Sequence, residues 1–238
     1  MSNFNNEEIG ISAEVAIADA FGISVTHGYR NRGNEYIVKL IQPYVANIFK
    51  SEGIPNPIKH IAEGQNPVDF ELSNGYTLSV KTNQQFSKKV APQNVGQPTS
   101  STYFQHFKKL YGNNIPSSYS ERCQLFKSVS IERIDEVMSI YWDNLFHCDY
   151  LLHLYNIIDN CGNINNNINY IVYPYLDSKS FEKSKFSFTQ TAQSWNESNT
   201  VKYSGITIGE FQVHNNRDCF KFRFNMDGVN KLLTNGIL

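Results

Sequence analysis

The chain has 238 residues, and its 21 basic and 22 acidic side chains give a formal net charge of −1. This balance excludes a protein that is basic over its whole surface, and no apolar run approaches the roughly 20 residues that span a bilayer. The length fits one large domain, or one domain with an appendage. Residues 1–8 have neither a basic start nor an apolar stretch, so they do not resemble a secretory signal. We therefore expect a cytoplasmic protein.

Cysteines and charges constrain the chain further. The four cysteines are scattered and form no C-x-x-C pair, which indicates reduced thiols rather than a disulfide framework or a zinc site. Residues 81–127 hold seven basic and one acidic side chain, whereas residues 128–178 hold one basic and seven acidic. A local basic block can neutralise DNA phosphates even in a protein that is neutral as a whole.

The N-terminal part carries two helical patterns. In residues 7–21 apolar side chains recur at helical spacing, and Gly22 provides a stop. Glu14 falls at the edge of the apolar face of this helix. Residues 35–50 predict a second helix, which Pro43 kinks or restarts. The segment up to residue 66 is rich in Pro, Gly and Asn and predicts an irregular approach to the next element.

A β-hairpin is predicted over residues 68–82, where both arms alternate apolar and polar side chains. The loop length decides which side chains share a face. A two-residue loop would pair Asp69 with Val80 and place a charge beside the core. A three-residue loop with Gly75 in the left-handed conformation instead pairs Asp69 with Ser79, and we prefer this register. The polar face then consists of Asp69, Glu71, Ser79 and Lys81.

The rest of the chain changes from helical to strand-like patterns. Residues 83–100 and 160–169 are expected to form loops. Helices are expected at 102–111, 119–127 and 131–158, the last capped by Ser130, strands at 170–176, 185–190, 205–213 and 219–224, and a closing helix at 227–233. This order predicts an α/β (α+β) fold, with helices around a mixed central sheet and a β-rich C-terminal part.

The hairpin also carries a chemical signal. Residues 66–83 read NPVDFELSNGYTLSVKTN, which is P-x-D followed after nine residues by S-x-K. This pattern resembles the PD-(D/E)XK nuclease superfamily, which includes most type II restriction endonucleases. Residues 88–100 resemble a segment found after the catalytic lysine in several small restriction endonucleases. The stretch GITIGEFQVHNNRDCFKFRF resembles the recognition region of compact four-base-pair cutters such as MspI. The resemblance implies a single nuclease domain over 1–238, with a catalytic core in about 1–128, a helical segment in about 129–160 and a β-rich DNA-recognition part in about 170–238.

By this resemblance Asp69 binds a metal ion, and Lys81 is the catalytic lysine that orients the nucleophile or stabilises the transition state. Ser79 stands at the position of the second acidic residue, so another carboxylate has to complete the metal site. The candidates, in order, are Glu14, Glu71 and Glu63.

The expected metal is Mg²⁺. A phosphodiester resists attack because it is already anionic, and a divalent cation neutralises developing charge and lowers the pKa of its bound water. Mg²⁺ prefers carboxylate and carbonyl oxygens. The expected metal ligands are Asp69, Glu14, Glu71 and Val80, and the expected catalytic residues are Asp69, Lys81, Ser79 and Glu14.

DNA contacts are expected from a polar turn between two late strands and from the basic block. Gln and Asn read adenine in the major groove, Arg and Lys read guanine, and phosphate contacts position the protein. An ordinary polar hairpin tip or a solvated lysine gives the same pattern. The expected DNA-binding residues are Lys88, Lys89, Gln93, Gln97, Gln212, His214, Asn215, Asn216, Arg217, Lys221 and Arg223.

Two hypotheses follow from these patterns. The first is a type II restriction endonuclease, a monomer or homodimer that makes Mg²⁺-dependent, sequence-specific cuts in double-stranded DNA and has a DNA methyltransferase as its genetic partner. The second is a non-catalytic DNA-binding or interaction domain on the same scaffold, in which Ser79 marks a lost metal site.

Overall fold

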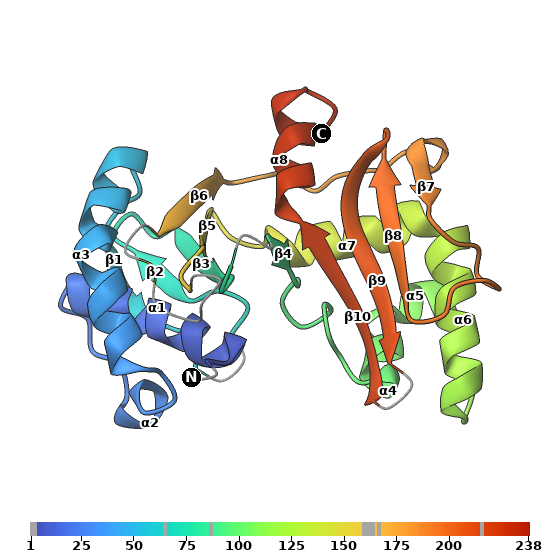
Figure 1. Cartoon of the computed structure of the whole chain (residues 1–238), viewed down its shortest axis with the longest axis horizontal. Helices are drawn as coiled ribbons and strands as arrows, with labels where there is room; N and C mark the ends of the chain where they lie inside the picture. Colours follow the sequence, from blue (N-terminus) through green and yellow to red (C-terminus); the bar gives the residue numbers. More distant parts are fainter. Residues whose placement is uncertain (1–3, 64–65, 86–87, 159–164, 166–167, 215–216) are drawn as a thin grey trace. The chain divides into compact units, whose positions relative to one another are not determined.

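A computed structural model describes residues 4–63, 66–85, 88–158, 165, 168–214 and 217–238. The chain forms two compact units, each built from two separate stretches of sequence. The first unit comprises residues 1–88 and 146–176, and the second comprises residues 89–145 and 177–238 (Figure 1). These units cut across the three segments expected from the sequence, because one stretch of the second unit interrupts the first.

The first unit contains a mixed five-stranded sheet in the order β1-β2-β3-β5-β6. The pair β3–β5 is parallel and the other neighbours are antiparallel. Its elements are α1 (Asn6–Ala20), α2 (His27–Arg30), α3 (Glu35–Glu52), β1 (Pro57–His60), β2 (Phe70–Leu72), β3 (Thr77–Thr82), β5 (Tyr150–Tyr155) and β6 (Asn169–Pro174). Helices α1 and α3, blue to cyan in Figure 1, pack together beside this sheet.

Local sequence explains where these helices begin and end. The Asn5 side chain caps α1, which stops at the predicted place, where Gly22 adopts a positive φ of 69°. Helix α3 is capped by Asn34 and ends at Gly53, which is also left-handed. Pro43 lies inside α3, which continues to Glu52, so of the two outcomes expected at this proline, a kink or a restart, the restart is wrong. Burial of the α3 residues on both sides of this proline holds the helix together despite the missing backbone donor.

The core of the first unit lies between these helices and the sheet. Ile9, Ala13 and Ile17 of α1 are fully buried, as the helical spacing predicts. They belong to one hydrophobic cluster with apolar side chains of α3, of the hairpin and of β5. The hairpin contributes the fully buried Phe70 and Leu78. One face of the β2–β3 hairpin is therefore fixed against α1 and α3, which determines how its remaining side chains are presented.

The hairpin has the predicted register. Phe70 pairs with Leu78 and Glu71 with Thr77, so Asp69 is aligned with Ser79. The Leu72 N–H donates to the Tyr76 carbonyl at 2.7 Å, and Gly75 has a φ of 83°. The three-residue loop and its left-handed glycine are thereby confirmed.

The second unit contains an antiparallel five-stranded sheet in the order β4-β10-β9-β8-β7. Its elements are β4 (Lys89–Val90), α4 (Ser100–His106), α5 (Lys108–Tyr111), α6 (Tyr119–Glu132), α7 (Ile134–Leu145), the 3₁₀ turn η1 (Lys183–Lys185), β7 (Phe186–Phe188), β8 (Ser198–Tyr203), β9 (Ile206–His214), β10 (Arg217–Asn225) and α8 (Met226–Thr234). The mixed α/β class is confirmed, and it is realised with two separate sheets.

Aromatic packing forms the core of the second unit. The alternating Phe220 and Phe222 of β10 turn to one side of the sheet, where helices α4, α6 and α7 lie. Phe220 stacks on Phe126 of α6 with ring centres 4.3 Å apart, and Phe222 stacks on Tyr141 of α7 at the same distance. Each such pair adds about 1 kcal/mol to the stabilisation from burial. The opposite face of β9 and β10 carries their polar side chains.

The helix expected at 131–158 is confirmed only for residues 134–145 and is wrong beyond them. Helix α6 already extends to Glu132, α7 ends at Leu145, and β5 follows as a central strand paired in parallel with β3. The expected cap, Ser130, is buried within α6. The sequence of β5 is a nearly continuous apolar run, and such a run does not distinguish a buried strand from a buried helix.

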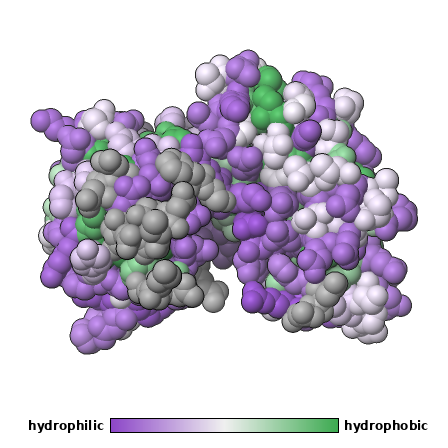
Figure 2. Space-filling model, in the orientation of Figure 1, coloured by the Kyte–Doolittle hydropathy of each residue, from purple (hydrophilic) through white to green (hydrophobic). Residues whose placement is uncertain are grey.

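The visible surface is predominantly hydrophilic, with hydrophobic residues in scattered patches (Figure 2). Among the described residues, no helix has both the length and the apolar composition needed to cross a membrane.

Candidate active site and nucleic-acid face

The carboxylate of Asp69 is held at the point where the β2–β3 ladder ends. The Val80 backbone N–H donates to Asp69 Oδ2 at 2.6 Å, and the Ser79 hydroxyl donates to the same oxygen at 3.2 Å. Asp69 is 5% exposed and Ser79 is 2% exposed. The aspartate expected on a polar hairpin face is therefore buried, and its orientation is fixed by two neighbours on β3.

Burial and charge act on Asp69 together. Burial raises its pKa to about 6, the Lys81 ammonium opposes this rise, and the Glu14 carboxylate adds to it. Lys81 lies on β3 and Glu14 on α1, so two segments far apart in the sequence act electrostatically on one buried carboxylate. Together with the Ser79 hydrogen bond, these effects link Asp69 to the other three residues expected to be catalytic.

Glu14 is itself held by two aromatic side chains. The Tyr29 hydroxyl donates to Glu14 Oε2 at 2.5 Å, and His60 Nε2 lies 3.0 Å from the same oxygen. The two rings meet edge to face, and the His60 ring packs in the same way on Phe70. Burial, followed by the neighbouring Glu14 charge, raises the pKa of Tyr29, so its hydroxyl remains a hydrogen-bond donor at neutral pH. These contacts fix the orientation of the Glu14 carboxylate.

Sequence reasoning missed both supporting residues. His60 lies on β1, in a segment expected to be irregular, and Tyr29 lies in the four-residue helix α2. Neither residue belongs to a motif, and contacts between residues 46 and 15 positions apart leave no periodic signal.

The other expected residues of this site are placed differently. Glu71 lies opposite Thr77 on the hairpin, and among the described residues no hydrogen bond or ion pair joins it to Asp69. Glu63 is exposed before the hairpin. The Ser79 hydroxyl and the Val80 backbone N–H both donate hydrogen bonds to the Asp69 carboxylate. Glu14, in contrast, contributes to the raised pKa of Asp69.

A thiol also lies near the site. Burial raises the pKa of Cys148 to about 12, although the Lys81 charge opposes the rise. The thiol is therefore protonated at neutral pH and does not supply a thiolate nucleophile.

The two carboxylates fit a Mg²⁺ ion by their chemistry. Each uses one oxygen for its protein contacts, and within the described part of the chain no hydrogen bond reaches Asp69 Oδ1 or Glu14 Oε1. Their mutual repulsion would be relieved by a cation. The described residues contain no cluster of three or more His, Cys, Asp or Glu arranged to hold a metal. Mg²⁺ commonly takes one or two carboxylates and keeps several waters.

A second group of expected residues meets on the polar face of the second unit. Lys221 of β10 pairs with Gln212 of β9, and Arg223 pairs with Glu210. These side chains are half-buried and alternate with the buried phenylalanines of the aromatic core. The strands therefore present two neighbouring rows of polar side chains on the face away from α6 and α7.

Gln97 extends the first of these rows. The Phe220 N–H donates to the Pro98 carbonyl at 3.2 Å, and the Phe222 N–H donates to the Gly96 carbonyl at 2.9 Å. This pairing aligns the exposed Gln97 with Lys221. We call the set Lys89, Gln97, Glu210, Gln212, Lys221 and Arg223 the polar sheet face.

Glu210 is the acidic member of this set. Its Oε2 lies 3.2 Å from Lys89 Nζ, and its Oε1 accepts from Arg223 at 3.2 Å and from Gln212 at 2.7 Å. Burial, followed by the charge of Arg223, lowers the pKa of Lys221. The face is therefore positively charged around one carboxylate. The sequence gives no signal that Glu210 meets these donors, because the contacts depend on the register of the strands.

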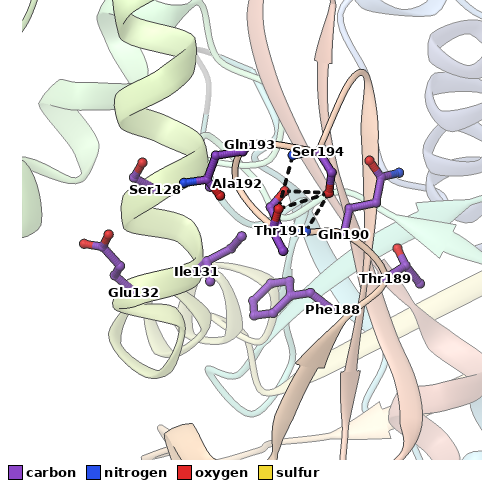
Figure 3. Close-up of a pocket in the computed structure, with 10 residues that line it drawn as sticks. All are labelled: Ser128, Ile131, Glu132, Phe188, Thr189, Gln190, Thr191, Ala192, Gln193 and Ser194. Carbon is purple, nitrogen blue, oxygen red and sulfur yellow. Dashed lines mark hydrogen bonds between the residues drawn. The ribbon is translucent and has the colours of Figure 1, made fainter.

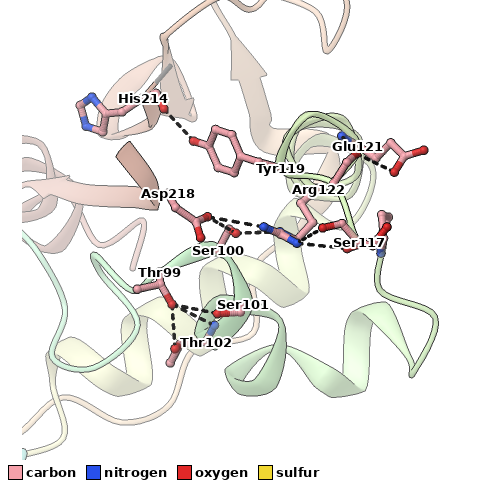
Figure 4. Close-up of polar contacts among 12 residues, drawn as sticks. Thr99, Ser100, Ser101, Thr102, Ser117, Tyr119, Glu121, Arg122, His214 and Asp218 are labelled. Atoms are coloured by element: carbon pink, nitrogen blue, oxygen red, sulfur yellow. Dashed lines mark hydrogen bonds and ion pairs between the residues drawn. The ribbon is translucent and has the colours of Figure 1, made fainter. Parts of the chain in front are cut away.

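The β9–β10 hairpin is anchored close to its tip (Figure 4). The Tyr119 hydroxyl donates to the His214 carbonyl at 2.7 Å. Arg122 donates to Ser100 Oγ at 2.7 Å and forms an ion pair with Asp218 at 3.7 Å, while the Ser100 hydroxyl donates to Asp218. Helices α4 and α6 thus hold the hairpin on which base contacts were expected.

The remaining expected DNA-binding residues are dispersed. Arg217 is exposed and pairs with His214 at the start of β10. Gln93 lies in the segment between β4 and α4. Lys88 belongs to the first unit, where its ammonium lies 4.5 Å from the centre of the Tyr155 ring. Asn215 and Asn216 lie outside the described residues.

An open pocket of about 500 Å³ lies elsewhere in the second unit (Figure 3). It is formed by α6 and by the segment that joins β7 to β8, where the Thr191 and Ser194 side chains bond to each other at 3.1 Å. Glu132 is the ionisable side chain in its described lining. This pocket includes none of the expected site residues and offers no pair of groups for acid–base or metal chemistry.

Comparison with known proteins points to one class of enzyme. Over 175 residues the chain is 30% identical to the type II restriction enzyme CviAII of Paramecium bursaria Chlorella virus 1. The chain is similar to a restriction enzyme. The match covers 72% of this chain and 46% of that enzyme, so the chain spans about half the length of this curated relative. No family model matches the chain. No solved structure matches it.

Proposed function

We propose that this chain is a type II restriction endonuclease, or part of one, that makes Mg²⁺-dependent, sequence-specific double-strand cuts in DNA by phosphodiester hydrolysis. The observation that carries the proposal is the buried Asp69 carboxylate, which Ser79 and Val80 hold against the strand that also bears Lys81, and on whose pKa the Lys81 and Glu14 charges act. A pair of carboxylates can hold a divalent cation that activates water, and an amine beside them can stabilise charge on the phosphate. The similarity to CviAII supports the same class of enzyme.

In this proposal the first unit is a PD-(D/E)XK core. Asp69 and Glu14 hold Mg²⁺, which when bound neutralises charge on the phosphate and activates a water. Lys81 orients that water and stabilises negative charge on the phosphate oxygens. Ser79 keeps the Asp69 carboxylate in place through its hydrogen bond, which accounts for a hydroxyl at this position. The Val80 carbonyl completes the protein ligands.

The polar sheet face is the proposed site of DNA recognition. Its arginine, lysine and glutamines are side chains that read guanine and adenine in the major groove. Neighbouring strands lie about 4.8 Å apart, so adjacent rows can reach neighbouring groups of one duplex. The partners are then double-stranded DNA and, in the host, a methyltransferase that protects the same sequence.

The test is digestion of a large plasmid by the purified full chain with Mg²⁺. We expect discrete fragments that are lost with EDTA. Lys81→Ala should abolish cleavage and leave DNA binding within about twofold, whereas Lys59→Ala, a change at an exposed lysine on β1 of the same sheet, should cut normally. DNA retention in a gel shift without any cutting would instead support a non-catalytic DNA-binding domain.

A second pair of variants tests the proposed ligand. Glu14→Gln should raise the Mg²⁺ concentration needed for half-maximal cleavage at least tenfold, because it removes one of two ligand charges. Glu71→Gln removes a charge from the β2–β3 hairpin that carries Asp69, and it should leave the Mg²⁺ titration unchanged. If the two results are reversed, Glu71 rather than Glu14 completes the metal site.

A further inference from the structure

Glu210 occupies an unusual position for a residue on a DNA-binding face. It is the acidic residue of the polar sheet face, its side chain is 16% exposed, and it accepts from three donors on three segments of the unit. Two of these donors, Lys89 and Arg223, are cations, the type of side chain that binds DNA phosphates. A carboxylate at this place repels DNA phosphates and lowers the affinity of the face for DNA. The presence of Glu210 therefore needs another explanation.

The contacts of Glu210 stabilise the fold only slightly, so stability explains only part of its presence on this face. The ion pair with Lys89 involves a lysine side chain that is 37% exposed, and such pairs contribute little because water screens them. The backbone positions of Arg223 and Gln212 are already fixed by the β9–β10 register, although their side chains bond to Glu210. The strands would therefore keep their arrangement without the charge, whereas the electrostatic character of the face would change.

The net charge of the polar sheet face affects how well it discriminates between DNA sequences. Lys and Arg bind phosphates of any sequence, and this sequence-independent attraction provides nearly all of non-specific binding. Discrimination instead needs donors and acceptors aimed at base edges, together with a repulsive element that weakens incorrect complexes. Glu210 supplies both, because it orients Arg223 and Gln212 and partly neutralises the two cations.

We infer that Glu210 is a specificity-determining residue, which suppresses sequence-independent binding and orients Arg223 and Gln212 toward base edges in the major groove. This inference rests on the proposed function, since it assumes that the chain recognises a DNA sequence. Guanine is the base that Arg223 would read, and adenine is the base for Gln212. Removal of the Glu210 charge should therefore strengthen binding to unrelated DNA and weaken discrimination.

The experiment compares dissociation constants for two duplexes, measured in EDTA so that no DNA is cut. One duplex carries the sequence that the wild-type protein selects from a randomised pool, and the other carries a scrambled sequence. We expect Glu210→Gln to bind the scrambled duplex at least about threefold more tightly and to reduce the ratio of the two constants by roughly tenfold. The binding constant of the variant for scrambled DNA should also fall more steeply with salt concentration, by a slope equivalent to about one additional phosphate contact. A purely structural role would not change this slope.

Three further variants complete the test. Glu136→Gln removes an exposed charge from α7, on the other side of the aromatic core, and should leave the ratio unchanged. Glu210→Asp keeps the charge and should retain most of the discrimination. If Glu210→Gln does not fold, Thr200→Lys replaces it, because Thr200 lies opposite Glu210 on β8 and a lysine there compensates the same charge.

The outcomes separate the inference from the proposed function. A wild-type protein that selects a sequence, combined with an unchanged ratio in Glu210→Gln or Thr200→Lys, overturns the role of Glu210 alone. A wild-type protein that selects no sequence overturns the proposed function and the inference with it. A reduced ratio in the variant, with the steeper salt dependence, supports both.

Discussion

His60 Nε2 lies 3.0 Å from Glu14 Oε2, and the His60 side chain is 1% exposed. The two residues come from β1 and α1, so this contact connects the sheet to the helix that carries the proposed second metal ligand. The Tyr29 hydroxyl donates to the same oxygen, and the Tyr29 and His60 rings meet edge to face. A carboxylate with two such partners is prevented from rotating away from Asp69.

The first prediction concerns these supporting contacts. His60→Phe retains the ring packing on Tyr29 and Phe70 but removes the contact to Glu14. We expect metal affinity to fall by roughly tenfold, in the range found when the residues that orient metal ligands are removed. Calorimetric titration of Mn²⁺ measures this affinity independently of cleavage. His27→Ala, a change at an exposed histidine of α2, is the control, and equal affinities in the two variants would contradict the prediction.

The second prediction concerns pH and stability without metal. Folding raises the pKa of Asp69 from 3.8 to about 6, so the folded state favours the protonated form. The stability that this preference contributes is fully present below about pH 4 and is lost as the pH rises through about 6. Asp69→Asn stays neutral at every pH and can still accept from Val80. We therefore expect it to stabilise the protein in EDTA at pH 8 by up to about 3 kcal/mol, and by less at pH 5.

Chemical denaturation at the two pH values checks this difference. Glu71→Gln serves as the control for removal of one negative charge from the hairpin. A destabilised Asp69→Asn at pH 8 would show that the carboxylate is not strained by burial, and would remove the physical basis of the raised pKa.

The third prediction concerns the contact between α8 and β9. A Cβ added at Gly228 would clash with the backbone carbonyl of Thr207. Gly228→Ala must therefore displace α8, whose Val229 and Leu232 are buried, at a cost of about 1–3 kcal/mol. Gly28→Ala in α2 meets nothing within 4 Å and should leave the melting temperature unchanged. Thermal melts followed by circular dichroism measure both, and equal melting temperatures would contradict the close approach.

The fourth prediction concerns the anchored hairpin. Tyr119→Phe keeps the ring against Phe220 but removes the hydrogen bond to the His214 carbonyl. We expect faster amide exchange at the start of β10 and weaker binding to the selected duplex. Because such a part-buried hydrogen bond contributes about 1 kcal/mol, the loss should be several-fold. Tyr44→Phe, on the surface of α3, is the matched control, and identical exchange in the two variants would show that the anchor does not order the hairpin.

Sequence patterns predicted the parts of the fold that depend on the local spacing of apolar and polar residues. The hairpin register follows from the alternation of apolar and polar residues on both arms, because only one loop length keeps Asp69 away from the core side. The α1 helix, its end at Gly22 and the position of Glu14 follow from helical spacing. The late strands β9 and β10 were also predicted within one or two residues at each end.

Properties that depend on distant contacts were not predictable. Strand β5 was taken for helix because its environment is buried on both faces and its residues therefore do not alternate. The division into two units depends on the parallel pairing of β3 with β5, which no local signal indicates. Lys88 and Lys89 are neighbours in the basic block, yet the structure places them in different units, so their shared role in DNA binding was an inference from sequence proximity alone.

The parallel pairing of β3 with β5 has a consequence for biosynthesis. When the ribosome has added residue 88, Glu14, Asp69 and Lys81 have all been made, but the strand next to Lys81 in the finished sheet is still more than sixty codons away. The nascent chain therefore cannot complete the interior of its first unit until the inserted stretch has been translated. Under the proposed activity, a growing polypeptide cannot damage the chromosome of its host before β5 has been made.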